Sequence, residues 1–186
     1  MRRISLAVLI MGSLSSGVAF ADNQSVSIGY AQSDVQDFKN IRGVNLQYRY
    51  EFDSPFSVVG SFTYMSGSED RNYYVDSDAV NTNIDVKYYS LMVGPAYRIN
   101  DYVSLYALGG AARTKADADV KWLNAGTNDI MRDSESYKST SFAYGAGIII
   151  NPVENMTINV GYEGTTADID DKYSINGFNV GIGYRF

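Results

Sequence analysis

Residues 174–186 at the end of the chain read SINGFNVGIGYRF, and every second position in the second half of this stretch carries a large apolar side chain. The apolar positions are Phe178, Val180, Ile182, Tyr184 and Phe186, and the residues between them are small or polar. A period of two residues predicts a β-strand with one apolar face and one polar face. Because an open strand edge invites pairing with other chains, a terminal strand of this kind predicts a sheet that closes on itself.

The same alternation recurs in seven earlier stretches. They are residues 25–33, 43–52, 57–65, 86–99, 103–112, 140–150 and 155–165. Short connections at 53–56, 100–102 and 151–154 alternate with longer ones at 34–42, 66–85, 113–139 and 166–173. Strands of about 9–11 residues suit a tilted bilayer crossing. An even number of strands, with short turns at one end and longer loops at the other, is typical of an outer-membrane barrel. We therefore predict an all-β fold: an eight-stranded antiparallel up-and-down transmembrane β-barrel.

Two kinds of barrel share this periodicity and differ in the face that looks inward. A soluble lipocalin-like barrel turns its apolar face toward a ligand, whereas a membrane barrel turns it toward lipid. An eight-stranded interior is just wide enough to be filled by side chains. Tyr, Phe, Leu and Ile crowd the apolar face of nearly every strand, which is too much volume for that interior. We therefore predict that the apolar face contacts lipid, with aromatic residues at the strand ends forming an interfacial girdle.

The polar face then lines the lumen and carries five long charged residues. They are Arg49, Glu51, Arg98, Glu163 and Arg185. Charges in a narrow interior of low dielectric need partners, and a guanidinium pairs well with a carboxylate. We predict a polar network of hydrogen bonds and ion pairs, in which Arg185 reaches Glu51 or Glu163. A lumen filled in this way excludes a wide aqueous channel and leaves no cleft for acid–base catalysis.

The N-terminus and the composition set further limits. A basic start at 1–3, an apolar run at 4–11 and the triplet Ala-Phe-Ala at 19–21 predict a signal peptide over 1–21 and a mature barrel over 22–186. The mature chain carries 13 basic and 21 acidic residues, a net charge of −8, which disfavours nucleic acid as a partner. The chain has no Cys and no His, which excludes disulfides, thiolate or imidazole metal sites and Ser-His or Cys-His catalysis. We expect no enzyme activity and no cofactor.

Several segments carry a family resemblance. They are GYAQS (29–33), GVNLQYRYE (43–51), GSFTY (60–64), VGPAYRIND (93–101), FAYGAG (142–147), NPVEN (151–155) and GFNVGIGYRF (177–186). Together they resemble the OmpX/Ail/PagC family of enterobacterial outer-membrane proteins. Within that family, VQDFKNIRGVN (35–45) and INGFNVGIGYRF (175–186) are most similar to the PagC branch. The resemblance implies an outer-membrane barrel without catalysis, with roles in host-cell adhesion, resistance to complement or survival inside host cells. It also implies that Tyr184 and Phe186 form a C-terminal signal read by the barrel assembly machinery, and that the charged lumen residues match those of the family.

Two functions remain as alternatives. In the first, extracellular loops on a rigid barrel bind host-cell, complement or matrix proteins, while the short turns and both termini are periplasmic. Tyr73, Tyr74, Trp122 and Tyr137 are candidate contacts because Tyr and Trp are enriched at interface hot spots, and the alternative is that they anchor at headgroups or pack the loops. In the second, the protein supports envelope integrity, and its acidic loops meet lipopolysaccharide through bridging divalent cations. A filled lumen disfavours a small-solute channel.

Overall fold

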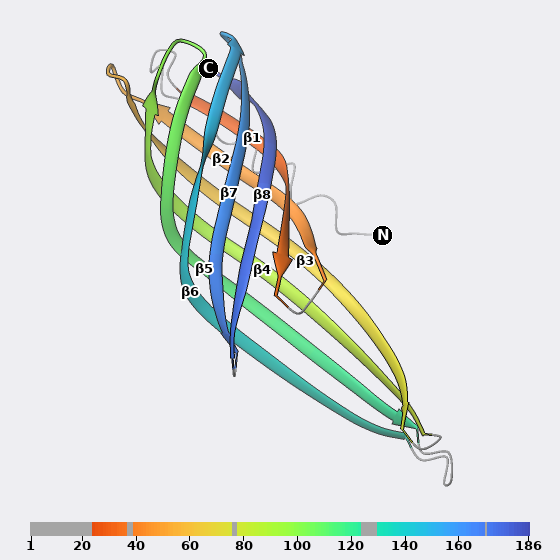
Figure 1. Cartoon of the computed structure of the whole chain (residues 1–186). Helices are drawn as coiled ribbons and strands as arrows, with labels where there is room; N and C mark the ends of the chain where they lie inside the picture. Colours follow the sequence, from red (N-terminus) through yellow and green to blue (C-terminus); the bar gives the residue numbers. More distant parts are fainter. Residues whose placement is uncertain (1–23, 37–38, 76–77, 124–129, 170) are drawn as a thin grey trace, which may run out of the picture.

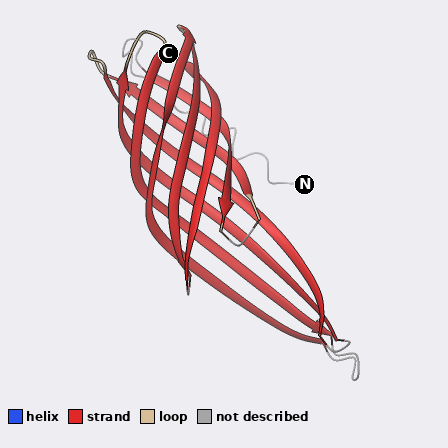
Figure 2. Cartoon of the chain, viewed as in Figure 1, coloured by secondary structure: helices blue, strands red, loops and turns tan. Residues whose placement is uncertain are grey.

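The computed structural model describes residues 24–36, 39–75, 78–123, 130–169 and 171–186, whose regular structure is β-strand (Figure 2). The strands are β1 (Gln24–Val35), β2 (Ile41–Glu51), β3 (Phe56–Val75), β4 (Asp78–Arg98), β5 (Val103–Leu123), β6 (Ile130–Val153), β7 (Met156–Ile169) and β8 (Asp171–Arg185). Within these ranges no helix has the length and apolar character needed to cross a membrane. The signal peptide predicted over 1–21 lies outside the described residues.

The strands form a closed barrel. Each strand pairs antiparallel with its neighbours along the chain, and β8 returns to pair with β1 (Figure 1). In that closing pair, Tyr184 stands opposite Val26. Two backbone hydrogen bonds of 3.0 and 2.9 Å join Gln24 and Phe186 beyond the last strand residue. The prediction of an eight-stranded antiparallel barrel that closes through residues 174–186 is confirmed.

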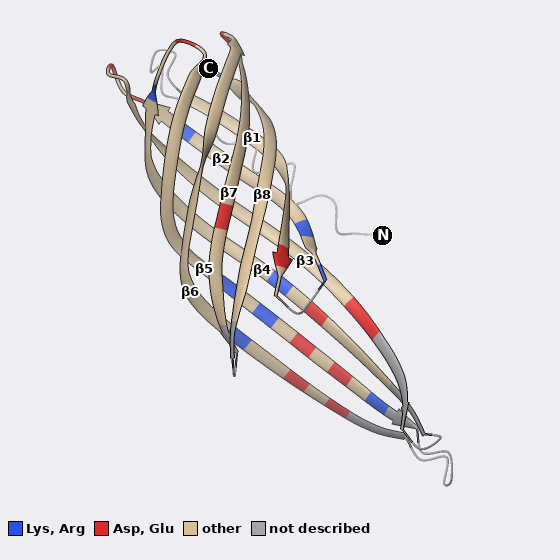
Figure 3. Ribbon diagram, viewed as in Figure 1, with Lys and Arg blue, Asp and Glu red and all other residues tan. Residues whose placement is uncertain are grey.

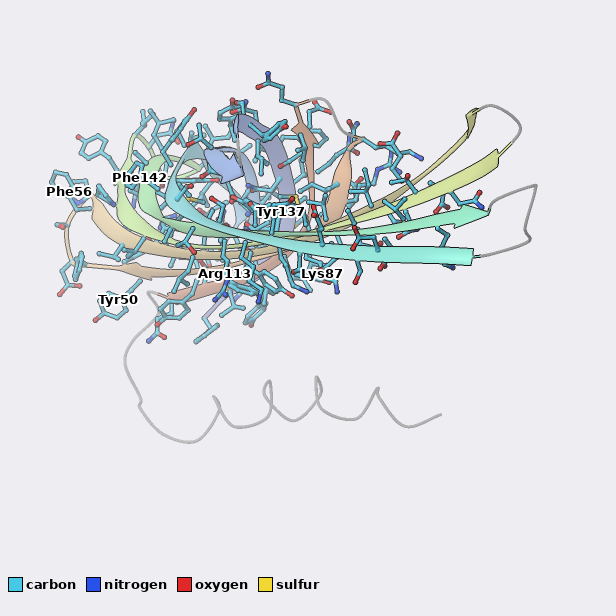
Figure 4. The ribbon with its side chains drawn as sticks, turned by 90° about the horizontal axis from the view of Figure 1, so that it is seen from below. Tyr50, Phe56, Lys87, Arg113, Tyr137 and Phe142 are labelled. Atoms are coloured by element: carbon cyan, nitrogen blue, oxygen red, sulfur yellow. The ribbon has the colours of Figure 1, made fainter. Side chains whose placement is uncertain are left out.

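The two faces of the wall are those of a membrane barrel. The large apolar side chains point outward, and Leu91 and Phe142 are 67% and 69% exposed. Figure 4 shows Phe56 and Phe142 projecting from the outside of the wall. The alternating polar residues point inward, and Thr63 and Asn45 are 0% and 1% exposed. The apolar face therefore surrounds the barrel, as predicted from the volume of its side chains.

Strands β3 to β6 are about twice as long as a bilayer crossing requires, and they project beyond the barrel as a four-stranded sheet (Figure 1). We call this part the protruding sheet. Pairing continues to Val75 opposite Asp78 in one hairpin and to Leu123 opposite Ile130 in the other. The structure thus corrects the loops predicted at 66–85 and 113–139, because most of these residues are strand. Apolar and polar residues alternate only weakly in these two segments. A sheet that packs against neither lipid nor a core does not need one apolar face.

The two other long connections, and the end of the lumen nearest the protruding sheet, also differ from the prediction. The connections predicted at 34–42 and 166–173 are partly strand, since β1 continues to Val35 and β2 begins at Ile41, while β7 and β8 continue to Ile169 and from Asp171. Val35, Ile41 and Ile175 are buried in one apolar cluster with Met65 and Val86. An apolar layer therefore closes this end of the lumen.

Candidate functional site

Four of the five charged lumen residues meet near the short turns. Glu51 is central, with a side chain that is 2% exposed, and its Oε2 accepts hydrogen bonds from Nη2 of Arg98 at 2.8 Å and of Arg185 at 3.1 Å. Its Oε1 lies 3.0 Å from Nε of Arg185 and 3.6 Å from Nη1 of Arg49. One carboxylate therefore contacts guanidiniums from β2, β4 and β8. We call these four residues the arginine cluster.

Arg49 ties this cluster to other strands of the wall. Its Nε donates a hydrogen bond to Ser57 on β3, and its Nη2 donates one to Ser104 on β5, both at 2.9 Å. Because β2 and β5 are not neighbours in the sheet, the contact with Ser104 crosses the lumen. A buried guanidinium held by an ion pair and two hydrogen bonds is a structural element of the core.

The fifth charged residue, Glu163 on β7, lies in a separate network. Its oxygens accept hydrogen bonds from the hydroxyls of Tyr88 at 2.5 Å and Thr63 at 2.8 Å, and Asn45 donates to Thr63 at 3.0 Å. Within the described ranges Glu163 forms no ion pair with an arginine or lysine. The predicted single network is therefore two networks, and Arg185 pairs with Glu51 rather than with Glu163.

Two tyrosines that cross the lumen were not among the predicted site residues. Tyr88 reaches from β4 to Glu163 on β7, and Tyr106 on β5 accepts a hydrogen bond from Gln47 on β2 at 3.2 Å. The Tyr106 hydroxyl lies against Gly161, where a Cβ atom would collide with it. The available signal is a pairing of sizes, because Tyr106 at an inward position of β5 faces Gly147 and Gly161 at inward positions of β6 and β7.

These contacts make the lumen a packed core. Hydrogen bonds join β2 to β5 and β4 to β7, so side chains from distant parts of the wall meet across the interior. A catalytic acid–base pair needs a cleft that a substrate can enter, and these carboxylates are engaged by protein donors. In the part of the chain that the structure describes, no three side chains of metal-binding type are grouped. The interior therefore supports a rigid scaffold.

A second group of charges lies on the outside of the wall. Lys87, Lys115 and Lys138 occupy directly opposed positions on β4, β5 and β6, and Arg113 stands opposite Tyr89. We call these four basic residues the cationic row. Figure 4 shows Lys87 and Arg113 on the same side of the sheet, and Figure 3 shows the row in blue where the sheet leaves the barrel. Like charges directly opposed across strands repel each other, so the row favours an anionic partner.

Toward the tips of the protruding sheet the sign of the charge changes. Asp85 and Asp117 stand opposite each other just beyond the row, and Asp119 follows (Figure 3). Nζ of Lys115 donates a hydrogen bond to Asp117 at 2.7 Å. This bond, together with one from Ser136, lowers the pKa of Asp117. The row therefore lies between the aromatic band of the barrel and an acidic stretch of the sheet.

The four candidate aromatic contacts all lie on strands of the protruding sheet. The side chains of Tyr73, Tyr74 and Trp122 lie outside the described part, although the register sets residues 73 and 122 on either side of Val80. Tyr137 is half-buried on the inward-facing side of β6, and its hydroxyl donates to Glu135.

At the chain end, the outward-facing rings of Tyr184 and Phe186 stack with their centroids 6.4 Å apart.

A closed eight-stranded barrel with an apolar outer face, a filled lumen and long hairpins at one end defines a small β-barrel of the outer-membrane class. A sequence model of the family described as "Enterobacterial Ail/Lom protein" matches residues 1–186. The chain belongs to this family. It is therefore an outer-membrane protein, and the predicted resemblance to OmpX, Ail and PagC is confirmed.

Relatives cover the whole chain. It is 46% identical over 190 residues to the virulence membrane protein PagC of Salmonella typhimurium and 38% identical over 194 residues to the attachment invasion locus protein of Yersinia enterocolitica, with 100% of both chains covered in each case. The crystal structure of Ail, the attachment invasion locus protein of Yersinia pestis, matches with a TM-score of 0.69 and 39% identity, over 90% of this chain and 100% of that one. A second structure of that Ail is a complex with the heparin analogue sucrose octasulfate, with a TM-score of 0.68, 40% identity and the same coverage.

Proposed function

We propose that this protein is a non-enzymatic surface protein that presents the protruding sheet to host molecules, in adhesion, serum resistance or survival inside host cells. The observation that carries the proposal is the sheet itself, which extends β3 to β6 well beyond the barrel (Figure 1). The long hairpins face outside the cell in this proposal, and the short turns face the periplasm. Relatives named for virulence and for attachment and invasion support the same role.

The edges of the protruding sheet offer a way to bind protein partners. Within the described residues, pairing of β3 with β2 ends at Ser66 and pairing of β6 with β7 ends at Ala143. Beyond these positions each outer strand has one row of backbone N–H and C=O groups facing away from the sheet. A partner strand can add to such an edge through main-chain hydrogen bonds. Charged residues along the edges, including Asp70 and Glu135, oppose indiscriminate pairing and so make recognition selective.

The charge of the protruding sheet distinguishes classes of partner. Asp85, Asp117 and Asp119 make its outer face acidic, which disfavours a polyanionic sugar on the sheet itself. The structure of Ail with a heparin analogue describes that relative, whose ligand is strongly anionic. In this chain an anion of that kind would meet favourable charge at the cationic row. We therefore assign protein partners to the sheet and anionic partners to the row.

The experiment that tests the sheet is a paired deletion. Residues 69–84 and 117–136 are replaced by two-residue turns, which removes both hairpins and leaves Lys87, Arg113 and Lys138 in place. Cells that display this variant should lose attachment to host cells and binding of serum proteins, relative to cells with equal amounts of the intact barrel. Attachment and serum-protein binding that both stay unchanged would refute the proposal.

A second candidate function is support of envelope integrity through lipopolysaccharide, and the cationic row favours it. Tyr64 and Tyr89, whose ring centroids are 5.0 Å apart, lie at the outer end of the lipid-facing band, next to Arg113. Basic residues beside an aromatic girdle lie at the level of lipid phosphates. The variant Lys87→Gln/Arg113→Gln/Lys138→Gln should lower copurification of lipopolysaccharide and increase detergent sensitivity, while host attachment stays unchanged. If only the hairpin deletion has an effect, this second function fails.

A further inference from the structure

The arginine cluster surrounds a cavity at the short-turn end of the lumen. The cavity measures about 120 Å³ and is lined by Arg49, Glu51, Arg98, Asp101, Ser104, Asn151 and Arg185. One water molecule takes up roughly 30 Å³ in the liquid, so the space accommodates a small polyatomic ion. We propose that this cavity binds a tetrahedral oxyanion, of which phosphate and sulfate are the simplest examples. This site is at the opposite end of the barrel from the protruding sheet, and its occupancy does not depend on the proposed surface function.

The balance of charge in the cluster favours an anion. Three guanidiniums surround one carboxylate, which leaves an excess of two positive charges around Glu51. Asp101 also lines the cavity, but it is exposed. Within the described residues, its carboxylate forms no ion pair with the three arginines of the cluster. Uncompensated charge is expensive where water is largely excluded. A divalent oxyanion would neutralise the excess, whereas the Glu163 network offers no comparable concentration of positive charge.

The supply of hydrogen-bond donors leads to the same conclusion. Each guanidinium has five N–H donors, whereas a carboxylate has about four acceptor positions. Arg49 uses Nε and Nη2 on serine hydroxyls, whereas Arg98 directs Nη2 to Glu51. Nε of Arg185 lies 3.0 Å from Glu51 without forming a hydrogen bond, so a buried N–H is left without an acceptor. An oxyanion in the cavity supplies acceptors for these donors in the fork geometry that arginine prefers.

The cavity is accessible from the short-turn end. The side chains of Arg98 and Arg185 are 34% and 24% exposed, whereas Arg49 and Glu51 at the inner wall are 3% and 2% exposed. Arg98 also lines an open cleft with the turn at 52–55, and Arg185 lines another with Glu154 and Phe186. An anion therefore enters past two partly exposed guanidiniums and meets a buried one. This graded exposure suits a phosphate that arrives from solution or from a lipid headgroup at this rim.

The test is a titration of the intact barrel in a detergent that contains no phosphate. Sodium phosphate is added at constant ionic strength, and binding is followed by calorimetry and by the arginine Nε–H resonances in NMR spectra. We expect saturable binding that perturbs the arginines of the cluster, with sodium chloride far weaker. Arg98→Gln should weaken phosphate binding about tenfold or more, since it removes charge-assisted hydrogen bonds. Glu51→Gln should strengthen phosphate binding, because it removes the competing carboxylate.

Matched controls separate this site from general charge effects. Arg113→Gln removes a guanidinium from the cationic row and should leave phosphate binding unchanged. If Glu51→Gln does not fold, Arg185→Gln is compared with Arg98→Gln, and both should weaken binding. Nanodiscs with phosphatidic acid distinguish the two sources of phosphate: perturbed cluster resonances that free phosphate reverses would indicate a headgroup. Absence of saturable binding, equal binding of chloride, or equal losses in Arg98→Gln and Arg113→Gln would overturn the proposal.

Discussion

Replacing Tyr88 with Phe removes one hydroxyl from the lumen and leaves the aromatic ring in place. That hydroxyl donates a hydrogen bond to Oε1 of Glu163, and the two residues are 1% and 4% exposed. Both oxygens of Glu163 accept hydrogen bonds, as those of a carboxylate do. Hydrogen bonds to charged groups contribute about 1.5–3 kcal/mol, so Tyr88→Phe should lower the free energy of unfolding by about that amount.

Tyr106→Phe provides the matched control. It also removes one hydroxyl from a ring that crosses the lumen, but this hydroxyl accepts from the neutral amide of Gln47. A hydrogen bond between neutral groups contributes about 0.5–1.5 kcal/mol, so the expected loss is smaller. Urea unfolding of the barrel in lipid vesicles measures both variants, and the effect of Tyr88→Phe should shrink in a Glu163→Gln background. An equal or larger loss for Tyr106→Phe, or no coupling between positions 88 and 163, would refute this reasoning.

Other consequences can be tested separately. Gly161→Ala should cost about 1–3 kcal/mol in the same unfolding assay, because its methyl group would collide with the Tyr106 hydroxyl; an unchanged midpoint would contradict this packing. Phe186→Ala should reduce the heat-modifiable folded band in cells while the purified chain still refolds in detergent; equal defects in both settings would argue against an assembly signal. Lys115→Gln should raise the pKa of Asp117 in NMR titrations, since the Lys115 hydrogen bond is the main cause of its lowering. The wild-type pair persists at neutral pH and is lost as pH falls through that lowered pKa, so identical titration curves would contradict the assignment. Replacing both hairpins by turns should leave SDS resistance unchanged, because the barrel closes independently of them.

Much of the fold is predictable because the residue types along each strand of the lipid-facing band indicate which side faces lipid and which side faces the lumen. Along β8, Phe178, Val180 and Ile182 face outward and Asn179 faces inward, as the alternation of residue types indicates. Side chains that touch lipid must be apolar, whereas inward ones must be small or paired. The same constraint assigns Arg49, Glu51 and Glu163 to the lumen from their positions in the alternating pattern alone.

The protruding sheet is not predicted, because its strands contact neither lipid nor the packed lumen, and so neither environment constrains their residue types. Tyr137 and Ala116 stand opposite each other in β6 and β5, but no periodic contrast marks them as strand. Pairing there is sustained by backbone hydrogen bonds between neighbouring hairpins, which leave little trace in composition. The buried layer at Val35 and Ile41 also escapes prediction, since two isolated apolar residues between polar neighbours do not differ from a loop in their pattern.

Local alternation along the chain is thus sufficient to specify the number of strands, their order and the face each turns to lipid. The partners within the lumen cannot be read in the same way. Arg185 meets Glu51 and not Glu163, and Tyr88 meets Glu163, because the stagger between strands around the closed barrel determines which levels face each other. That stagger is a property of all eight pairings together, and no single stretch of sequence contains it.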